Sequence, residues 1–296
     1  MKNIYELADA NKRKSTFIIV LFIAFITFAS YFLAYSFGYD LSLVGFALIF
    51  SGIISFASYY YSDKIILSIS SAIPANRQDH FEFYTVTENL CLVAGIPKPN
   101  LYVIEDTAMN AFATGRDPEH AVVVATTGLL QKLNRTELEG VVAHELSHVK
   151  NYDIRLMGIV TVLVGMITLL ADILLRSRIR SSKRDDSGQL GIIIFLVGFV
   201  LALLSPLIAN LIKLAISRRR EFLADASSVK LTRYPEGLKR ALIKISQDTE
   251  PLEAANKATA HLYISNPLKN THSAIGWFAK AFNTHPPIEE RIAALS

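Results

Sequence analysis

The 296-residue sequence predicts a mainly helical α+β protein, with four apolar helices in a membrane and a soluble domain that contains a small β-sheet. Two compositional observations support this fold class. Mean hydropathy is +0.34, and charged residues make up 19% of the chain, against roughly 25% in typical soluble domains. A third observation is that the apolar residues gather in four long runs, whereas the segments between and after these runs show short strand-like and helical patterns.

The first two apolar runs, residues 16–38 and 41–62, are each long enough to span a bilayer as a helix. Only a short link containing Asp40 separates them, so we expect a tight helical hairpin. A signal peptide has a shorter apolar region of about 7–15 residues, which favours an uncleaved anchor. The basic residues 12–14 precede the first run and favour the cytoplasm, so both ends of the hairpin are expected inside.

The third and fourth apolar runs are residues 156–171 and 190–212. The linker between them is rich in arginine at residues 176–184. If both runs span the bilayer, this linker lies outside, against the usual preference of positive charge for the cytoplasm. The sequence leaves a spanning hairpin and a shallow interfacial one open, and we favour the spanning arrangement.

The remaining sequence predicts a soluble domain that the second apolar pair divides. The expected parts are the N-terminal hairpin 1–62, the first part of the domain 63–155, the second hairpin 156–216 and the second part of the domain 217–296. Periodicity and turn residues predict helices at 79–94, 218–231 and 234–247, and strands at 100–104, 111–114 and 121–125. The last strand alternates poorly, which indicates burial on both faces. Thr136-Glu-Leu-Glu139 has the spacing of a capping box and is expected to open a further helix.

Charge and cysteine content exclude several classes of protein. Lys and Arg number 30 and Asp and Glu 26, giving a net charge of +4. We attribute this excess to residues beside the membrane runs. No basic stripe marks a soluble face, so nucleic acid is not an expected partner. The single cysteine, Cys91, cannot form an intrachain disulfide, and its apolar neighbours predict a buried, inert thiol.

The helix that begins near Thr136 contains the sequence His144-Glu-Leu-Ser-His148. Histidines at i and i+4 lie on one face of a helix, about 6 Å apart along its axis. Both imidazoles can therefore reach one zinc ion, and Glu145 can take a proton from a water at that ion. The neighbouring residues are largely apolar, and such a helix would rarely bury two histidines and a glutamate without a metal.

A catalytic zinc requires a third protein ligand and an open position. In the metzincin pattern this ligand is a histidine six residues after the second one, where this chain has Ile154. Glu221-Phe-Leu-Ala-Asp225 offers two acids on one helix face, so Glu221 can bind zinc while Asp225 accepts a hydrogen bond from a ligating histidine. Three histidines remain as rival ligands: His261, His272 and His285.

The order of these motifs resembles the HtpX family of membrane zinc endopeptidases, which are related to the eukaryotic CAAX-prenyl endopeptidases. Three further motifs fit the resemblance, namely Asn110-Ala-Phe-Ala-Thr-Gly115, Ser217-Arg-Arg-Arg-Glu221 and Thr284-His-Pro-Pro-Ile-Glu-Glu-Arg291. The resemblance implies that Asn110 and His285 lie at the active site near the substrate, and that Arg291 contacts the metal-binding carboxylate. A substrate could also add as a strand beside Ala111 and Phe112.

Together the motifs predict a gluzincin-type zinc protease domain with one zinc ion per chain, held by His144, His148 and Glu221. Glu145 is the expected general base, and His285 is a candidate donor to the oxyanion. The resemblance implies a multi-pass protein of the inner (plasma) membrane, active on the cytoplasmic side. Its expected substrates are membrane or misfolded proteins in quality control and stress response. The alternative is a catalytically silent membrane scaffold or chaperone with structural zinc. The oligomeric state stays open.

Overall fold

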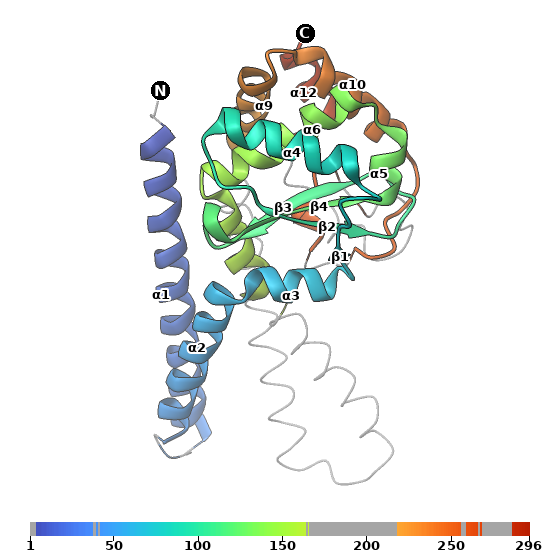
Figure 1. Ribbon diagram of the computed structural model, residues 1–296. Helices are drawn as coiled ribbons and strands as arrows, with labels where there is room; N and C mark the ends of the chain where they lie inside the picture. Colours follow the sequence, from blue (N-terminus) through green and yellow to red (C-terminus); the bar gives the residue numbers. More distant parts are fainter. Residues whose placement is uncertain are drawn as a thin grey trace.

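The computed structural model describes residues 4–37, 40, 42–163, 165, 218–255, 259–265, 267 and 286–296. A helical hairpin stands beside a compact domain in which several helices surround a small sheet (Figure 1). The domain joins segments from before residue 163 and after residue 218, so residues far apart in the sequence share one core. The predicted mainly helical fold with a small sheet is therefore confirmed.

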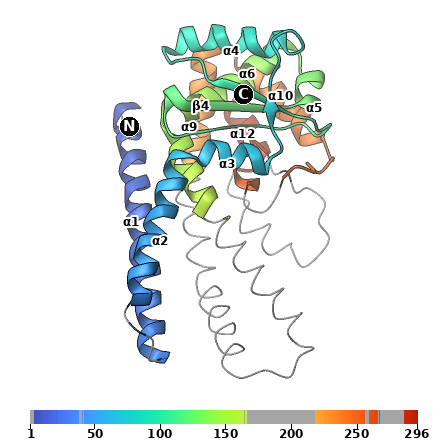
Figure 2. The ribbon, with the colours of Figure 1, turned by 60° about the horizontal axis from the view of Figure 1, so that its bottom comes forward.

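The hairpin consists of α1 (Ile4–Phe37) and α2 (Ser42–Tyr60), which pack side by side in both views (Figures 1 and 2). Its first helix begins well before the expected apolar run, so residues 12–14 lie inside α1. In the described part of the chain, no single helix has both the length and the apolar character to cross a membrane. The two pieces Val44–Tyr60 and Ser62–Ile69 meet that standard together, with a bend of 78° between them.

The sheet has four strands in the order β1-β2-β4-β3. Its strands are β1 (Ile73–Pro74), β2 (Asn100–Ile104), β3 (Ala111–Gly115) and β4 (Ala121–Thr126). The central pair β2 and β4 is parallel, and β1 and β3 add antiparallel at the two edges. Three of these strands match the predictions, and β4 is buried along its whole length, as its poor alternation suggested. The edge strand β1 was not predicted.

Helices cover both faces of this sheet. They are α3 (Ser62–Ile69), α4 (Phe81–Ala94), α5 (Thr127–Lys132), α6 (Arg135–Lys150), α9 (Arg218–Thr232), α10 (Pro235–Gln247) and α12 (Ile288–Ala294), with short 3-10 turns at Pro118–His120 and Ala260–Leu262. One face packs on α4, α6 and α10, and the other packs on α3 and on residues 252–255, 262 and 263. The resulting two-sided core fixes α6 against the sheet.

The helix α6 begins at Arg135, one residue before Thr136. Asn134 is its N-cap: the Asn134 side chain accepts a hydrogen bond from the Glu137 N–H at 3.0 Å, and Glu137 accepts one from the Asn134 N–H at 2.9 Å. The capping box is therefore Asn134 to Glu137, and the predicted box at Thr136 is wrong. Thr136 instead lies in the first turn and donates to Asn134 Oδ1.

The second expected membrane hairpin lies almost entirely outside the described residues. Residues 153–163 form a helix directly after α6, which covers the start of the run 156–171. The rest of that run, the linker 176–184 and the whole of 190–212 fall outside the description. Whether this pair spans a membrane stays a prediction.

Candidate metal centre

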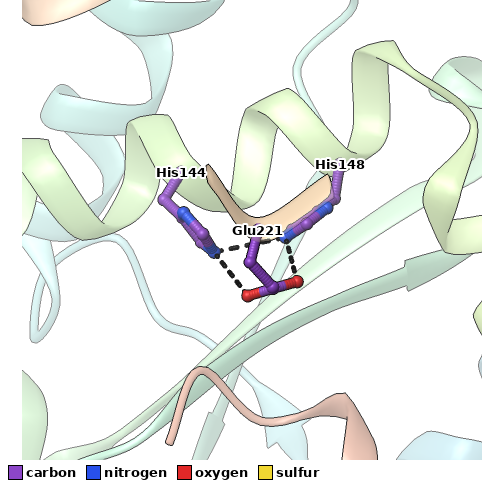
Figure 3. Close-up of side chains that lie close together, drawn as sticks. All are labelled: His144, His148 and Glu221. Carbon is purple, nitrogen blue, oxygen red and sulfur yellow. Dashed lines mark hydrogen bonds and ion pairs between the residues drawn. The ribbon is translucent and has the colours of Figure 1, made fainter. Parts of the chain in front are cut away.

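His144 and His148 project in the same direction from neighbouring turns of α6 (Figure 3). Their Nε2 atoms are 3.2 Å apart, and both side chains are buried. The helix can hold them there because it packs on the sheet and is covered by α4, α9 and α10. Two nitrogens at this separation are too close to be left in contact without a shared proton or a cation.

Glu221, in the first turn of α9, faces both histidines (Figure 3). One carboxylate oxygen lies 3.7 Å from His144 Nε2, and the other lies 3.6 Å from His148 Nε2. Ligand atoms at about 2.0–2.1 Å from a tetrahedral zinc ion are roughly 3.3 Å apart, so this spacing and this donor set fit such an ion. The structure therefore brings His144, His148 and Glu221 together as one candidate metal site.

Asp225 and Arg291 lie behind the candidate ligands. Asp225 Oδ1 is 2.9 Å from His144 Nδ1, so His144 can present its other nitrogen to a metal. Burial by itself raises the pKa of the Asp225 carboxyl, but hydrogen bonds from His144 and Arg291 outweigh it and lower that pKa. Arg291 is bidentate to Asp225 and more distant from Glu221, at 3.8 Å. Arg291 therefore contacts the candidate metal-binding carboxylate of Glu221, as the resemblance implied, but its shorter bonds go to Asp225.

Asp153 is a functional candidate that the sequence analysis missed. Its Oδ2 lies 3.1 Å from His148 Nδ1, and it is buried. Burial opposes protonation of His148, yet the hydrogen bond to Asp153 and the charge of Glu221 raise its pKa to about 9. The two histidines therefore have matched carboxylates, Asp225 for His144 and Asp153 for His148. The signal available in the sequence was an acid five residues after the second histidine.

Glu145 follows His144 on α6 and is buried beside the candidate ligands. Burial raises the pKa of its carboxyl, while the charges of His144 and His148 oppose that change. A carboxyl group with a raised pKa next to a metal-activated water is suited to accept and return a proton. The position is therefore chemically compatible with the predicted general base.

The predicted substrate residues lie at the edge strand β3. Asn110 is buried, and its side-chain amide donates to the Ser265 carbonyl at 3.1 Å and accepts from the Ser265 N–H at 3.4 Å. The Ala111 carbonyl accepts from the Ile264 N–H at 2.9 Å. Phe112 is fully buried and meets the ring of Tyr263 edge to face. This edge therefore already holds a segment of the same chain.

The other histidines do not join the metal site in the described part of the chain. His261 is buried, with its Nε2 2.9 Å from the Thr161 hydroxyl. His120 pairs with Asp117 near the surface, where these two residues and Glu119 form a separate, largely exposed group. His272 and the candidate catalytic His285 lie outside the described residues.

Comparisons with known proteins agree with this site. Peptidase family M48 matches residues 78–296. Protease HtpX homologs from Thermoanaerobacter pseudethanolicus and Dictyoglomus turgidum are 45% and 46% identical, covering 99% and 98% of this chain and 97% and 93% of the relatives. A homolog from Streptococcus uberis is 41% identical over 99% of both chains.

A solved structure gives independent support for the fold. The crystal structure of S. mikatae Ste24p matches with a TM-score of 0.51 at 19% identity, covering 99% of this chain and 67% of that one. At this identity the likeness concerns the fold alone. The full-length relatives confirm the HtpX resemblance that the motifs indicated. The chain belongs to peptidase family M48, and it is a metalloprotease.

Proposed function

We propose that this metalloprotease binds one zinc ion and cleaves membrane or misfolded proteins at the cytoplasmic face of a membrane. The observation that carries the proposal is the buried set His144, His148 and Glu221, with Glu145 on the same helix. Two imidazoles and one carboxylate form a three-ligand set that leaves a position for water and substrate, as catalytic zinc requires. A structural zinc site normally closes with four protein ligands, among which cysteine dominates.

The catalytic roles follow from the neighbours of each group. When bound, the metal ion supplies Lewis-acid activation of water and of the scissile carbonyl. Glu145 takes a proton from the attacking water and returns it to the leaving amine. Asp225 and Asp153 accept hydrogen bonds from the Nδ1 atoms of His144 and His148, which orients each Nε2 toward the ion. His285 is proposed as a donor to the developing oxyanion.

We further propose that the substrate main chain pairs with the β3 edge. The main-chain bond from the Ile264 N–H to the Ala111 carbonyl supports this placement, because it is the kind of contact that an extended peptide makes at a strand edge. The Asn110 side-chain amide, which binds the Ser265 main chain, could hold a substrate main chain in the same way. A substrate that uses the Ala111 carbonyl has to release it from Ile264 first. Phe112 then contributes through packing beneath the strand rather than through an exposed side chain.

The membrane location is supported by the apolar hairpin α1–α2, whose exposed residues include Phe17, Phe28, Phe46 and Ile53. Four spans with an internal N-terminus would place α6 and α9 on the same, cytoplasmic side. Single cysteines at Ser181 or Ser187, in a Cys91→Ser background, test this topology. They should react with an impermeant thiol reagent outside intact cells. Reaction only after the membrane is opened would contradict the spanning arrangement.

The activity itself is tested by measuring zinc content and casein cleavage together, before and after chelation. One zinc per chain, with cleavage lost on chelation and restored by zinc, is the expected result. Zinc retention without any proteolysis would instead support a scaffold with structural zinc. The purified full-length chain is used, because both halves of the domain contribute ligands.

A further inference from the structure

A polar side chain of the N-terminal helix α1 reaches the surroundings of the metal site. Asn11 lies in the first third of α1 and is only 3% exposed. Its amide nitrogen donates to the Asn151 carbonyl at 2.9 Å and to Asp153 Oδ1 at 2.7 Å. Both partners lie about 140 positions away in the sequence. Both N–H groups of the Asn11 amide are thus committed to the segment that follows α6.

Asp153, the acceptor for Asn11, also connects the two helices that supply the candidate ligands. Its other oxygen, Oδ2, lies 3.1 Å from His148 Nδ1. Arg220, the residue before Glu221 on α9, donates to Asp153 Oδ1 at 3.3 Å. Asp153 therefore contacts α1, α6 and α9, and its orientation affects both His148 and the start of the helix that carries Glu221.

The turn that carries Asp153 is held in a conformation with an energetic cost. Tyr152 has φ 58°, in the left-handed region that residues other than glycine rarely adopt because it is strained for them. Two neighbouring residues of α1 contact this turn. Asn11 binds the Asn151 carbonyl, and the Lys12 ammonium lies 4.3 Å from the centre of the Tyr152 ring. Such strain persists where surrounding contacts hold it, and α1 provides these contacts.

We propose that Asn11 is a positioning residue for the metal site, acting through Asp153 on His148. The amide fixes one oxygen of Asp153, so that the other faces His148 Nδ1 and keeps Nε2 directed at the ion. The first helix of the hairpin is then part of the metal site as well as an anchor. This inference rests on the proposed site of His144, His148 and Glu221.

The first experiment compares zinc affinity in two full-length variants, by competition with a chromophoric chelator. Asn11→Leu removes both donors and should weaken zinc binding about tenfold, the lower end of the 10–100-fold loss typical of groups behind the ligands. Ser15→Ala is the matched control, because Ser15 is similarly buried one turn along α1 and, among the residues that the structure describes, its hydroxyl donates to the Asn11 carbonyl of its own helix. Its affinity should stay within about twofold of the wild type.

A second variant distinguishes the loss of the hydrogen bonds from a packing defect caused by the leucine side chain. Asn11→Asp keeps the size and shape of the side chain but turns a carboxylate toward Asp153 at the former 2.7 Å contact. Repulsion between like charges should weaken zinc binding further than Asn11→Leu does. Zinc affinity equal to wild type in both variants would overturn the proposal, even if their unfolding temperatures in the metal-free state fall.

The decisive measurement is a double-mutant cycle with Asp153→Asn. If Asn11 acts through Asp153, Asn11→Leu should cause no further loss of zinc affinity in the Asp153→Asn background. An undiminished loss in that background would refute the route through Asp153. A wild-type chain that holds no zinc at all would overturn the metal site itself, and this inference with it. The two failures are therefore distinguishable.

Discussion

Arg291 donates from Nε and Nη2 to both carboxylate oxygens of Asp225, at 2.9 and 2.6 Å, and its side chain is 0% exposed. Asp225 Oδ1 also lies 2.9 Å from His144 Nδ1, so one carboxylate joins the arginine and a candidate ligand. Burial opposes the charge of the guanidinium, but the bonds to Asp225 and the nearby acids raise the pKa of Arg291. The cluster keeps its charges buried by pairing them.

Arg291→Met should destabilise the metal-free protein by about 3–5 kcal/mol, because it leaves the buried Asp225 carboxylate without the charge of its arginine partner. Chemical denaturation of the full chain measures this change. Arg135→Met is the control, since the ion pair between Arg135 and Glu139 is largely exposed and should contribute at most about 1 kcal/mol. A loss for Arg291→Met no larger than for the control would show that the buried pair does not stabilise the fold.

Glu145→Gln should abolish peptide hydrolysis while zinc stays bound, since the proposed base is lost and the ligands remain. General-base catalysis typically contributes about 10²–10⁴-fold, and the rate of casein cleavage measures the loss. Glu139→Gln, also on α6 but partly exposed, is the matched control and should leave the rate unchanged. Turnover of Glu145→Gln within about tenfold of the wild type would contradict the base assignment.

Glu221→Gln should weaken zinc binding more than Asp225→Asn does. Glu221 faces both histidine Nε2 atoms, whereas Asp225 contacts His144 from behind. Losses around a metal site typically reach about 10–100-fold, and we expect Asp225→Asn to fall in that range. Chelator competition at fixed pH compares the two variants. The reverse order of severity would exchange the roles of these acids.

Gly140→Ala should destabilise the domain, because α6 and α10 approach closely there. A Cβ at Gly140 would lie 2.5 Å from the backbone nitrogen of Leu238, so one of the helices has to move. Overpacking of this kind costs about 1–3 kcal/mol, which exceeds the usual gain from alanine in a helix. Gly52→Ala on α2 is the control, since its Cβ meets no atom within 4 Å. Equal unfolding temperatures for both variants would contradict this packing.

The Cys91 thiol should resist alkylation in the folded protein. Burial raises its pKa from 9.0 to about 11, so the reactive thiolate stays scarce at pH 8.5. Because the thiol ionises more readily in the unfolded chain, the shift lowers the free energy of unfolding as the pH rises from about 9 to about 11. Below pH 9 the stability of the folded state is retained in full. Iodoacetamide labelling, with and without denaturant, measures the protection. Gln131→Cys in a Cys91→Ser background places an exposed thiol on the surface and should react in both the folded and the unfolded state. If Cys91 of the folded wild type reacts as fast as this exposed cysteine, its burial is contradicted.

The local parts of the candidate site could be predicted from the sequence. His144 and His148 are one helical turn apart, so their shared face follows from helix geometry alone. Glu221 and Asp225 share a face of α9 for the same reason. The structure adds which chain segments meet, and it places these two helix faces together.

The contacts that the sequence did not predict depend on turns and on distant packing. Asp153 returns toward His148 because Tyr152 adopts a left-handed conformation, which no residue pattern indicated. The cap of α6 was assigned to Thr136 because threonine and glutamate three residues later match a capping box, although Asn134 and Glu137 have the same spacing. β1 has only two residues, one of them a proline, so it has no periodicity to detect.

The candidate site is assembled from three widely separated stretches of chain, at residues 144–153, 221–225 and 291. During synthesis on the ribosome, the helix with both histidines emerges long before Glu221, and Arg291 emerges later still. A nascent chain therefore lacks a complete ligand set until its second half has been made. The proposed peptidase site can therefore form only after translation has passed these residues.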